Sequence, residues 1–99
     1  MSSEAYVIIK QNEYMRKFRN AGATEASKAK TLVELKVKND RIFRKMADKD
    51  VFRPGRAPET YYLDLGAADD FIQARRRRAF YLLILVIVVA ALVFILGRR

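Results

Sequence analysis

The stretch RIFRKMADKDVFRPGRAPETYYL, residues 41–63, contains the clearest structural signals of this chain. Its first nine residues, 41–49, place their apolar side chains on one side of a helical wheel and predict an amphipathic helix with a mostly basic outer face. Two short segments rich in β-formers, 51–53 (VFR) and 60–63 (TYYL), predict strands. The Pro- and Gly-containing segment between them, 54–59 (PGRAPE), predicts the turn of a hairpin.

Helix signals also lie upstream of this stretch. Thr31 and Glu34 are three residues apart before a short apolar run, and this capping-box pattern predicts a helix beginning at Thr31. That helix must be short, because residues 37–40 (VKND) indicate a turn and a second cap. Further upstream, Asn12 is a suitable cap for a helix over residues 13–20.

Downstream of the hairpin, the chain becomes strongly apolar. Asp64 is expected to cap a last helix that continues without interruption from Leu65 to Leu96, about 48 Å. Residues 79–96 (AFYLLILVIVVAALVFIL) contain no charged group. As a helix they extend about 27 Å, close to the hydrocarbon thickness of about 30 Å, and their transfer into a bilayer is favourable by about 4 to 8 kcal/mol. They predict a transmembrane helix.

Arginines flank this span unequally. Four precede it and two follow it: Arg75, Arg76, Arg77 and Arg78, then Arg98 and Arg99. Because basic residues are retained on the cytoplasmic side, the imbalance predicts a single-pass, tail-anchored protein with a cytoplasmic N-terminal domain. Tyr81 is expected at headgroup level, and the arginines serve as an interfacial anchor or, alternatively, recognise anionic lipids specifically.

The composition excludes several classes of site. The 99-residue chain has a net charge of +9 and contains no cysteine and no histidine. This excludes thiolate and imidazole metal sites, disulfides and histidine-dependent catalytic triads. The four glycines are scattered and form no phosphate-binding loop. We therefore expect no enzymatic activity, no cofactor and no metal.

The order of predicted elements resembles a winged helix-turn-helix domain: a helix, a short capped helix, a turn, a basic amphipathic helix, and a hairpin with a Pro/Gly tip. The resemblance covers residues 13–65. It implies a mainly α (α+β) fold with a two-stranded hairpin, in which residues 40–49 form a recognition helix that enters the major groove of DNA. The hairpin, 53–60, would be the wing that contacts the DNA backbone or minor groove.

One element of that family, a strand between the first two helices, is not evident. Residues 6–9 (YVII), which also suit a helix lead-in, or part of 23–30 are the candidates. The predicted organisation is a lead-in (1–10), a winged-helix-like domain (11–65), a basic juxtamembrane helix (66–78), a transmembrane helix (79–97) and a short tail (98–99).

The resemblance implies nucleic-acid binding by the basic helix and the wing. The candidate residues are Lys38, Asn39, Arg41, Arg44, Lys45, Arg53 and Arg56. The cations would contact phosphates, and Arg41 or Arg44 could read guanine edges. Three observations oppose DNA binding: Asp48 lies within the basic face, residues 1–74 carry a net charge of only +3, and an anionic leaflet would repel DNA. An ordinary solvated helix face is the alternative.

A second hypothesis is an accessory subunit or adaptor of a membrane protein complex that acts through protein contacts, since a fold does not fix a function. Tyr61 and Tyr62 are adjacent in a predicted strand, so their side chains are expected on opposite faces, and an outward tyrosine would suit a contact anchor. Packing of both at the domain edge is the alternative. A homodimer is compatible with either hypothesis.

Overall fold

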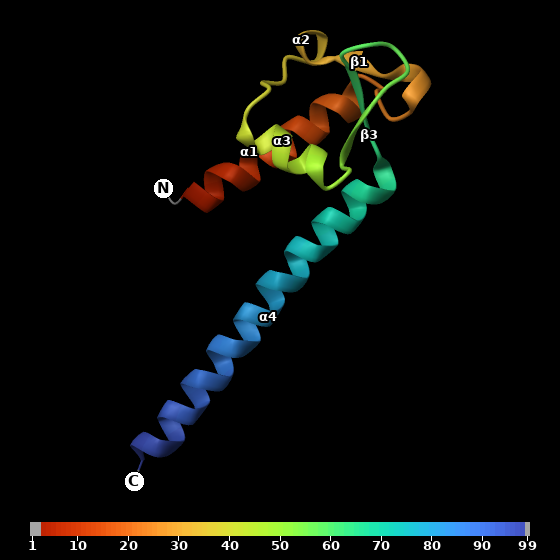
Figure 1. Ribbon diagram of the computed structural model, residues 1–99. Helices are drawn as coiled ribbons and strands as arrows, with labels where there is room; N and C mark the ends of the chain where they lie inside the picture. Colours follow the sequence, from red (N-terminus) through yellow and green to blue (C-terminus); the bar gives the residue numbers. More distant parts are fainter. Residues whose placement is uncertain (1–2, 99) are drawn as a thin grey trace. The chain divides into compact units, whose positions relative to one another are not determined.

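The computed structural model, which describes residues 3–98, is mainly helical with a small antiparallel sheet, as the sequence predicts (Figure 1). The helices are α1 (Ser3–Asn20), α2 (Leu32–Leu35), α3 (Arg41–Asp48), α4 (Leu65–Gly97) and a 3-10 turn, η1 (Ala26–Lys28); the strands are β1 (Lys30–Thr31), β2 (Phe52–Pro54) and β3 (Thr60–Leu63). The chain divides into two compact units, the first ending at Asp69 and the second beginning at Asp70.

The sheet has the strand order β1-β3-β2, and both pairs are antiparallel. The predicted hairpin is formed by β2 and β3, with Arg53 opposite Tyr62. The additional strand, β1, pairs Thr31 with Thr60 and lies between α1 and α2 in the chain. This is the strand that the sequence left unassigned, and its first residue is the last residue of the candidate segment 23–30.

The predicted start of the first helix is wrong. Helix α1 begins at Ser3, so the apolar run at 6–9 is helical and Asn12 lies well inside the helix on its exposed side. The physical reason is that Val7 shares a helical face with Tyr14 and Phe18, which are buried in the core. The continued apolar face favours a helix through Asn12, where a cap was predicted from residue type alone.

Helices α1, α2 and α3 end in the same way. The residue that terminates each helix has a left-handed backbone: Gly22 (φ 73°), Lys36 (φ 58°) and Asp50 (φ 62°). The next N–H in each case donates 3.0 Å back to a carbonyl of the last turn, from Ala23 to Phe18, from Val37 to Leu32 and from Val51 to Met46. These residues are buried, so each Schellman-type ending turns the chain into the core.

Helices α2 and α4 begin at their predicted caps. The Thr31 hydroxyl accepts from the Glu34 N–H at 3.2 Å, and the Glu34 carboxylate accepts from the Thr31 N–H at 3.5 Å, which completes the capping box of α2. Asp64 caps α4 by accepting from the Ala67 N–H at 3.0 Å. Local side-chain bonds therefore fix where these two helices begin.

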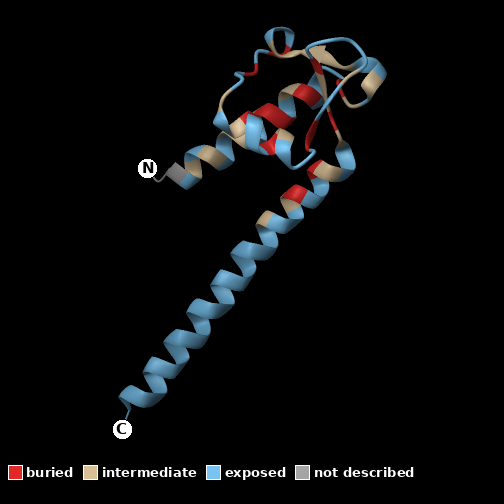
Figure 2. Cartoon of the chain, viewed as in Figure 1, coloured by how far each residue is buried: buried red, intermediate tan, exposed pale blue. Residues whose placement is uncertain are grey.

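The centre of the domain is a stack of three aromatic rings. Phe52 of β2 lies between Phe18 of α1 and Phe43 of α3, at centroid distances of 4.5 and 5.0 Å. Tyr61 of β3 meets Phe43 edge-on at 5.2 Å. The three phenylalanines are no more than 2% exposed and form part of the buried region of Figure 2. This stack joins both helices to the sheet.

The loop between β2 and β3 folds back onto η1. A Cβ on Gly55 would lie 2.2 Å from the Ala29 Cβ and 2.6 Å from the Thr60 hydroxyl oxygen, so only glycine fits this approach. The Arg56 N–H donates to the Ala26 carbonyl at 3.4 Å. The predicted wing is thus held against the segment that precedes β1.

Helix α4 is continuous, as predicted, and extends one residue beyond the expected end. Every described residue from 76 to 98 is exposed (Figure 2). Among the described residues, this helix alone is long and apolar enough to cross a membrane.

Replacing Phe52 by Ala should lower the free energy of unfolding of the domain by about 3 to 5 kcal/mol, because it removes the ring in the middle of the stack and leaves a cavity. Denaturant titration followed through the near-ultraviolet tyrosine signal measures the loss. Val33→Ala is the matched control, since Val33 is 88% exposed, and should change stability by less than about 0.5 kcal/mol. A similar loss in both variants would contradict the central role of the stack.

Candidate nucleic-acid interface

The orientation of α3 is fixed by its N-cap, Asp40. One carboxylate oxygen of Asp40 accepts from the Phe43 N–H at 2.9 Å, and the other accepts from the Tyr14 hydroxyl of α1 at 2.5 Å. The sequence predicted the cap but not its partner on α1. This pair ties the beginning of α3 to the middle of α1, while Phe43 and Met46 hold the inner side of α3 in the core.

The Tyr14–Asp40 pair shifts both ionisation equilibria. Burial and the hydrogen bond to Asp40 raise the pKa of Tyr14 well above its usual value. Partial burial acts to raise the pKa of Asp40, but the bonds donated by the Tyr14 hydroxyl and by backbone N–H groups outweigh it and lower that pKa. The ionised cap is therefore the form that the folded domain stabilises.

The outer side of α3 carries Arg41, Arg44, Lys45 and Asp48, all of them exposed, as the helical wheel predicts. None of these four side chains has an ion-pair partner among residues 3–98. The Arg44 guanidinium donates to the carbonyl of Asn39 at 3.1 Å, a bond that holds its stem against the start of the helix. The charges on this face are consequently available to a ligand.

Two open hollows adjoin this face. One, of about 480 Å³, lies on the β3 side of α3, and the other, of about 310 Å³, lies on the α1 side. The first is lined by Asn39, Arg41, Phe43, Arg44, Lys45, Ala47, Asp48 and Tyr61; the second is lined by Val7, Gln11, Arg41, Ile42 and Lys45. Arg41 and Lys45 line both.

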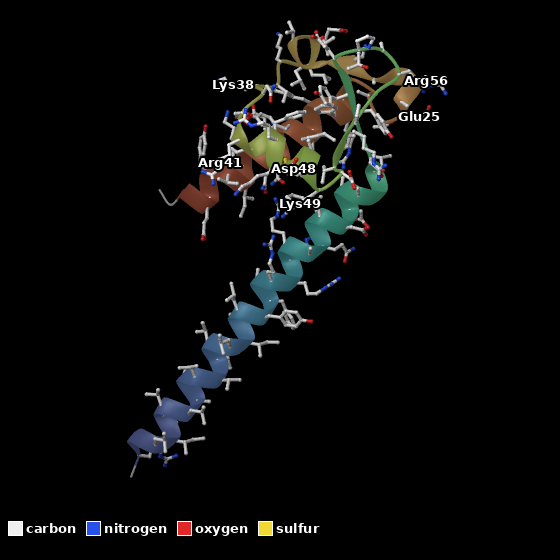
Figure 3. All side chains as sticks on the ribbon, in the orientation of Figure 1. Glu25, Lys38, Arg41, Asp48, Lys49 and Arg56 are labelled. Carbon is white, nitrogen blue, oxygen red and sulfur yellow. The ribbon has the colours of Figure 1, made fainter. Side chains whose placement is uncertain are left out.

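Among the remaining candidates, the structure separates Arg53 and Arg56 from this group. Lys38 is exposed in the loop before α3 (Figure 3). Arg53 forms an ion pair with Asp64, Nε to Oδ2 at 3.0 Å, so its charge supports the β2–α4 junction. Arg56 lies near Glu25 on the η1 side of the domain, well apart from Arg41 (Figure 3). The structure thus brings together Asn39, Arg41, Arg44 and Lys45.

Sequence reasoning missed Tyr61 as part of this region. Both Tyr61 and Tyr62 are partly buried, so neither is the fully outward tyrosine that strand alternation predicts. The ring of Tyr61 packs against Phe43 and also lines the larger hollow. Its position depends on the packing of Tyr61 of β3 against Phe43 of α3. These two residues are far apart in the chain, so no local sequence pattern predicts the contact.

The predicted membrane-interface residues that the structure describes lie on α4, except Arg98, which directly follows it. Arg76, Arg77, Arg78, Tyr81 and Arg98 are exposed, and Arg99 lies outside the described residues. Arg75 is partly buried, with its guanidinium 5.9 Å from the centre of the Phe71 ring. Burial and the neighbouring charges of Arg76 and Arg78 lower the pKa of Arg75. The four consecutive arginines, 75–78, are each rotated by about 100° from the one before, so their side chains project on all sides of the helix.

Among residues 3–98, no group of three acidic side chains is placed to hold a metal ion. No protein-family model matches the chain, and neither curated proteins nor solved structures show significant similarity to it.

Asp40→Ala should destabilise the domain by about 0.5 to 2 kcal/mol at pH 7, through loss of the N-cap. Because the folded-state pKa of Asp40 is lowered, its contribution is complete above the unfolded pKa of about 3.9 and is lost as the pH falls through the folded value. The difference in unfolding free energy between wild type and variant should therefore shrink as the pH is lowered from 6 to 2.

Unfolding titrations at several pH values measure this difference. Asp69→Asn, which removes an exposed carboxylate outside α3, is the control and should leave the domain nearly as stable as wild type. A difference between wild type and Asp40→Ala that stays constant down to pH 2 would show that the cap does not act through its ionised form.

Proposed function

We propose that this chain is a single-pass membrane protein that holds a small, winged-helix-like DNA-binding domain on the cytoplasmic face. The membrane part is supported by the exposure of α4. Its large apolar side chains between Phe80 and Leu96 are 42 to 65% exposed. A continuous apolar surface of this extent is unfavourable in water and favourable in a bilayer, where the helix satisfies its own backbone hydrogen bonds.

The orientation follows from the flanking charges. The arginine run before the span outnumbers the basic residues that follow it, and basic residues close to a span remain on the cytoplasmic side. The folded domain precedes this run in the chain and is therefore expected in the cytoplasm.

The DNA-binding part rests mainly on the outer face of α3. Three cations without an ion-pair partner among the described residues lie on one helix face beside an open hollow. A helix with an exposed basic face is the element that enters the major groove in helix-turn-helix proteins. The element order α1-β1-α2-α3-β2-β3, with β3 central in the sheet, also supports the proposal. It includes β1, a strand between the first two helices of the kind that was not evident from the sequence.

The separation of Arg53 and Arg56 limits the expected contacts. Arg53 is paired with Asp64, and Arg56 lies on the η1 side of the domain. We therefore expect α3 to dominate binding and the hairpin to contribute little. With few phosphate contacts, affinity should be modest and should fall as salt is added.

Insertion in the membrane is tested by a paired substitution at the centre of the span. Ile87→Asp with Val88→Asp should release the full chain from membranes, because two central aspartates add about 5 to 7 kcal/mol and offset the favourable transfer energy. The control is Ile87→Leu with Val88→Leu, which should remain inserted. Extraction of membranes with alkaline carbonate measures the difference. If the aspartate variant remains in the membrane fraction, α4 is not a transmembrane helix.

DNA binding is tested with the full chain in nanodiscs of zwitterionic lipid, titrated with duplex DNA across a salt series. Arg41→Ala and Arg44→Ala should each weaken binding about tenfold and reduce the slope of log affinity against log salt by about 0.9 for each lost phosphate contact. Arg16→Ala is the matched control, since Arg16 is an exposed arginine of α1. Equal losses in all three variants would contradict an interface on α3.

One observation favours the adaptor function instead. Several apolar side chains of the domain are exposed: Tyr6 (50%), Ile9 (55%) and Val33 (88%). Exposed apolar groups suit contact with another protein. If wild type binds no duplex at low salt, the adaptor function becomes the better explanation, and substitutions at Tyr6 and Ile9 should reduce recovery of the partner on purification.

A further inference from the structure

The feature of α3 that the DNA-binding proposal leaves unexplained is Asp48. Its carboxylate is exposed on the same face as the cations and lines the same hollow as Arg44 and Lys45. The spacing from Arg44 to Asp48 is one that allows side chains to meet on a helix. Nevertheless, no ion pair of Asp48 is formed among residues 3–98, and Arg44 donates to the Asn39 carbonyl.

Local physical chemistry also disfavours an acid at this position. Asp48 is the last residue of α3, and a negative charge in the final turn interacts unfavourably with the helix dipole. It also reduces the attraction of the face for phosphate. A carboxylate without an ion-pair partner in the described part of the chain therefore adds nothing to helix stability or to non-specific DNA binding, and a role in recognition would account for it.

The position of Asp48 along α3 corresponds to a defined distance on DNA. Arg41 and Asp48 lie at the two ends of the helix (Figure 3). Seven residues of α-helix rise about 10.5 Å, and successive base pairs are about 3.4 Å apart. A helix lying along the major groove would therefore place Asp48 about three base pairs from the base pair that Arg41 contacts.

The side chains of Arg41 and Asp48 also form different hydrogen bonds with bases. Arginine donates to the O6 and N7 acceptors of guanine, whereas a carboxylate accepts from the N4 amino group of cytosine. We propose that Asp48 is a specificity-determining residue that accepts a hydrogen bond from a cytosine N4 amine, about three base pairs from a guanine read by Arg41. This inference rests on the proposed DNA-binding function of α3.

Such a residue improves discrimination while it lowers affinity for other sequences. Beside a base other than cytosine, the carboxylate faces hydrogen-bond acceptors or lacks a donor. Binding to non-cognate DNA is therefore penalised more than binding to the cognate site. In the amino-acid sequence, an acid within the basic face of α3 counted against DNA binding. In this proposal, the same residue, Asp48, selects the DNA sequence.

The experiment is selection of a randomised duplex library by the full chain in nanodiscs of zwitterionic lipid. Four proteins are compared: wild type, Asp48→Asn, Asp48→Ala and Glu25→Gln. The last removes one negative charge from the same domain at a place well away from α3 (Figure 3), so it controls for the change in net charge alone.

Wild type should enrich cytosine at one position by about tenfold, a difference typical of a good base contact. Asp48→Asn should change this preference to adenine, because asparagine pairs with the N6 and N7 groups of adenine. Asp48→Ala should lose the preference at that position and bind random duplex more tightly than wild type. Glu25→Gln should keep the wild-type preference.

Two other outcomes would overturn parts of the interpretation separately. If wild type binds duplex and the Asp48 variants select the same bases at every position, the reading role of Asp48 is wrong while DNA binding by α3 stands. If wild type binds no duplex at any salt concentration, the proposed DNA-binding function fails and this inference fails with it.

Discussion

The domain depends on one packing arrangement, the stack in which Phe52 lies between Phe18 and Phe43. Each ring comes from a different element, so the stack brings α1, α3 and β2 to a common centre. A domain of about 70 residues buries a single small core. Little else in so small a core could replace these contacts, and the three Schellman-type helix endings serve to direct the chain back to it.

The proposed interface follows from the same arrangement. Because the stack and Met46 hold the inner side of α3, the opposite side with Arg41, Arg44, Lys45 and Asp48 must face solvent. The Tyr14–Asp40 bond then fixes where α3 begins relative to α1. The interface is thus presented by a helix whose position is determined on two sides, which is what base recognition requires of a reading element.

Positive charge is distributed unequally along the chain. The arginine run of α4 supplies a large share of the net charge of +9, and its position before the apolar span suits lipid headgroups. The face of α3 carries three cations and one carboxylate, a balance that suits selective more than strong binding of a polyanion. The net charge of the whole chain does not reveal this difference between α3 and α4.

Local patterns in the sequence determined the span, the β2–β3 hairpin, the capping box at Thr31 and the caps at Asp40 and Asp64, because each depends on neighbours a few residues away. The start of α1 and the strand β1 were decided by the tertiary structure, since Val7 lies beside Ile42 of α3 and the two β1 residues pair with β3. The tertiary structure also decided the ion pair between Arg53 and Asp64 and the close approach of Gly55 to Ala29. Residue type gives a side chain its chemistry, but packing between distant elements decides which charges remain free for a ligand.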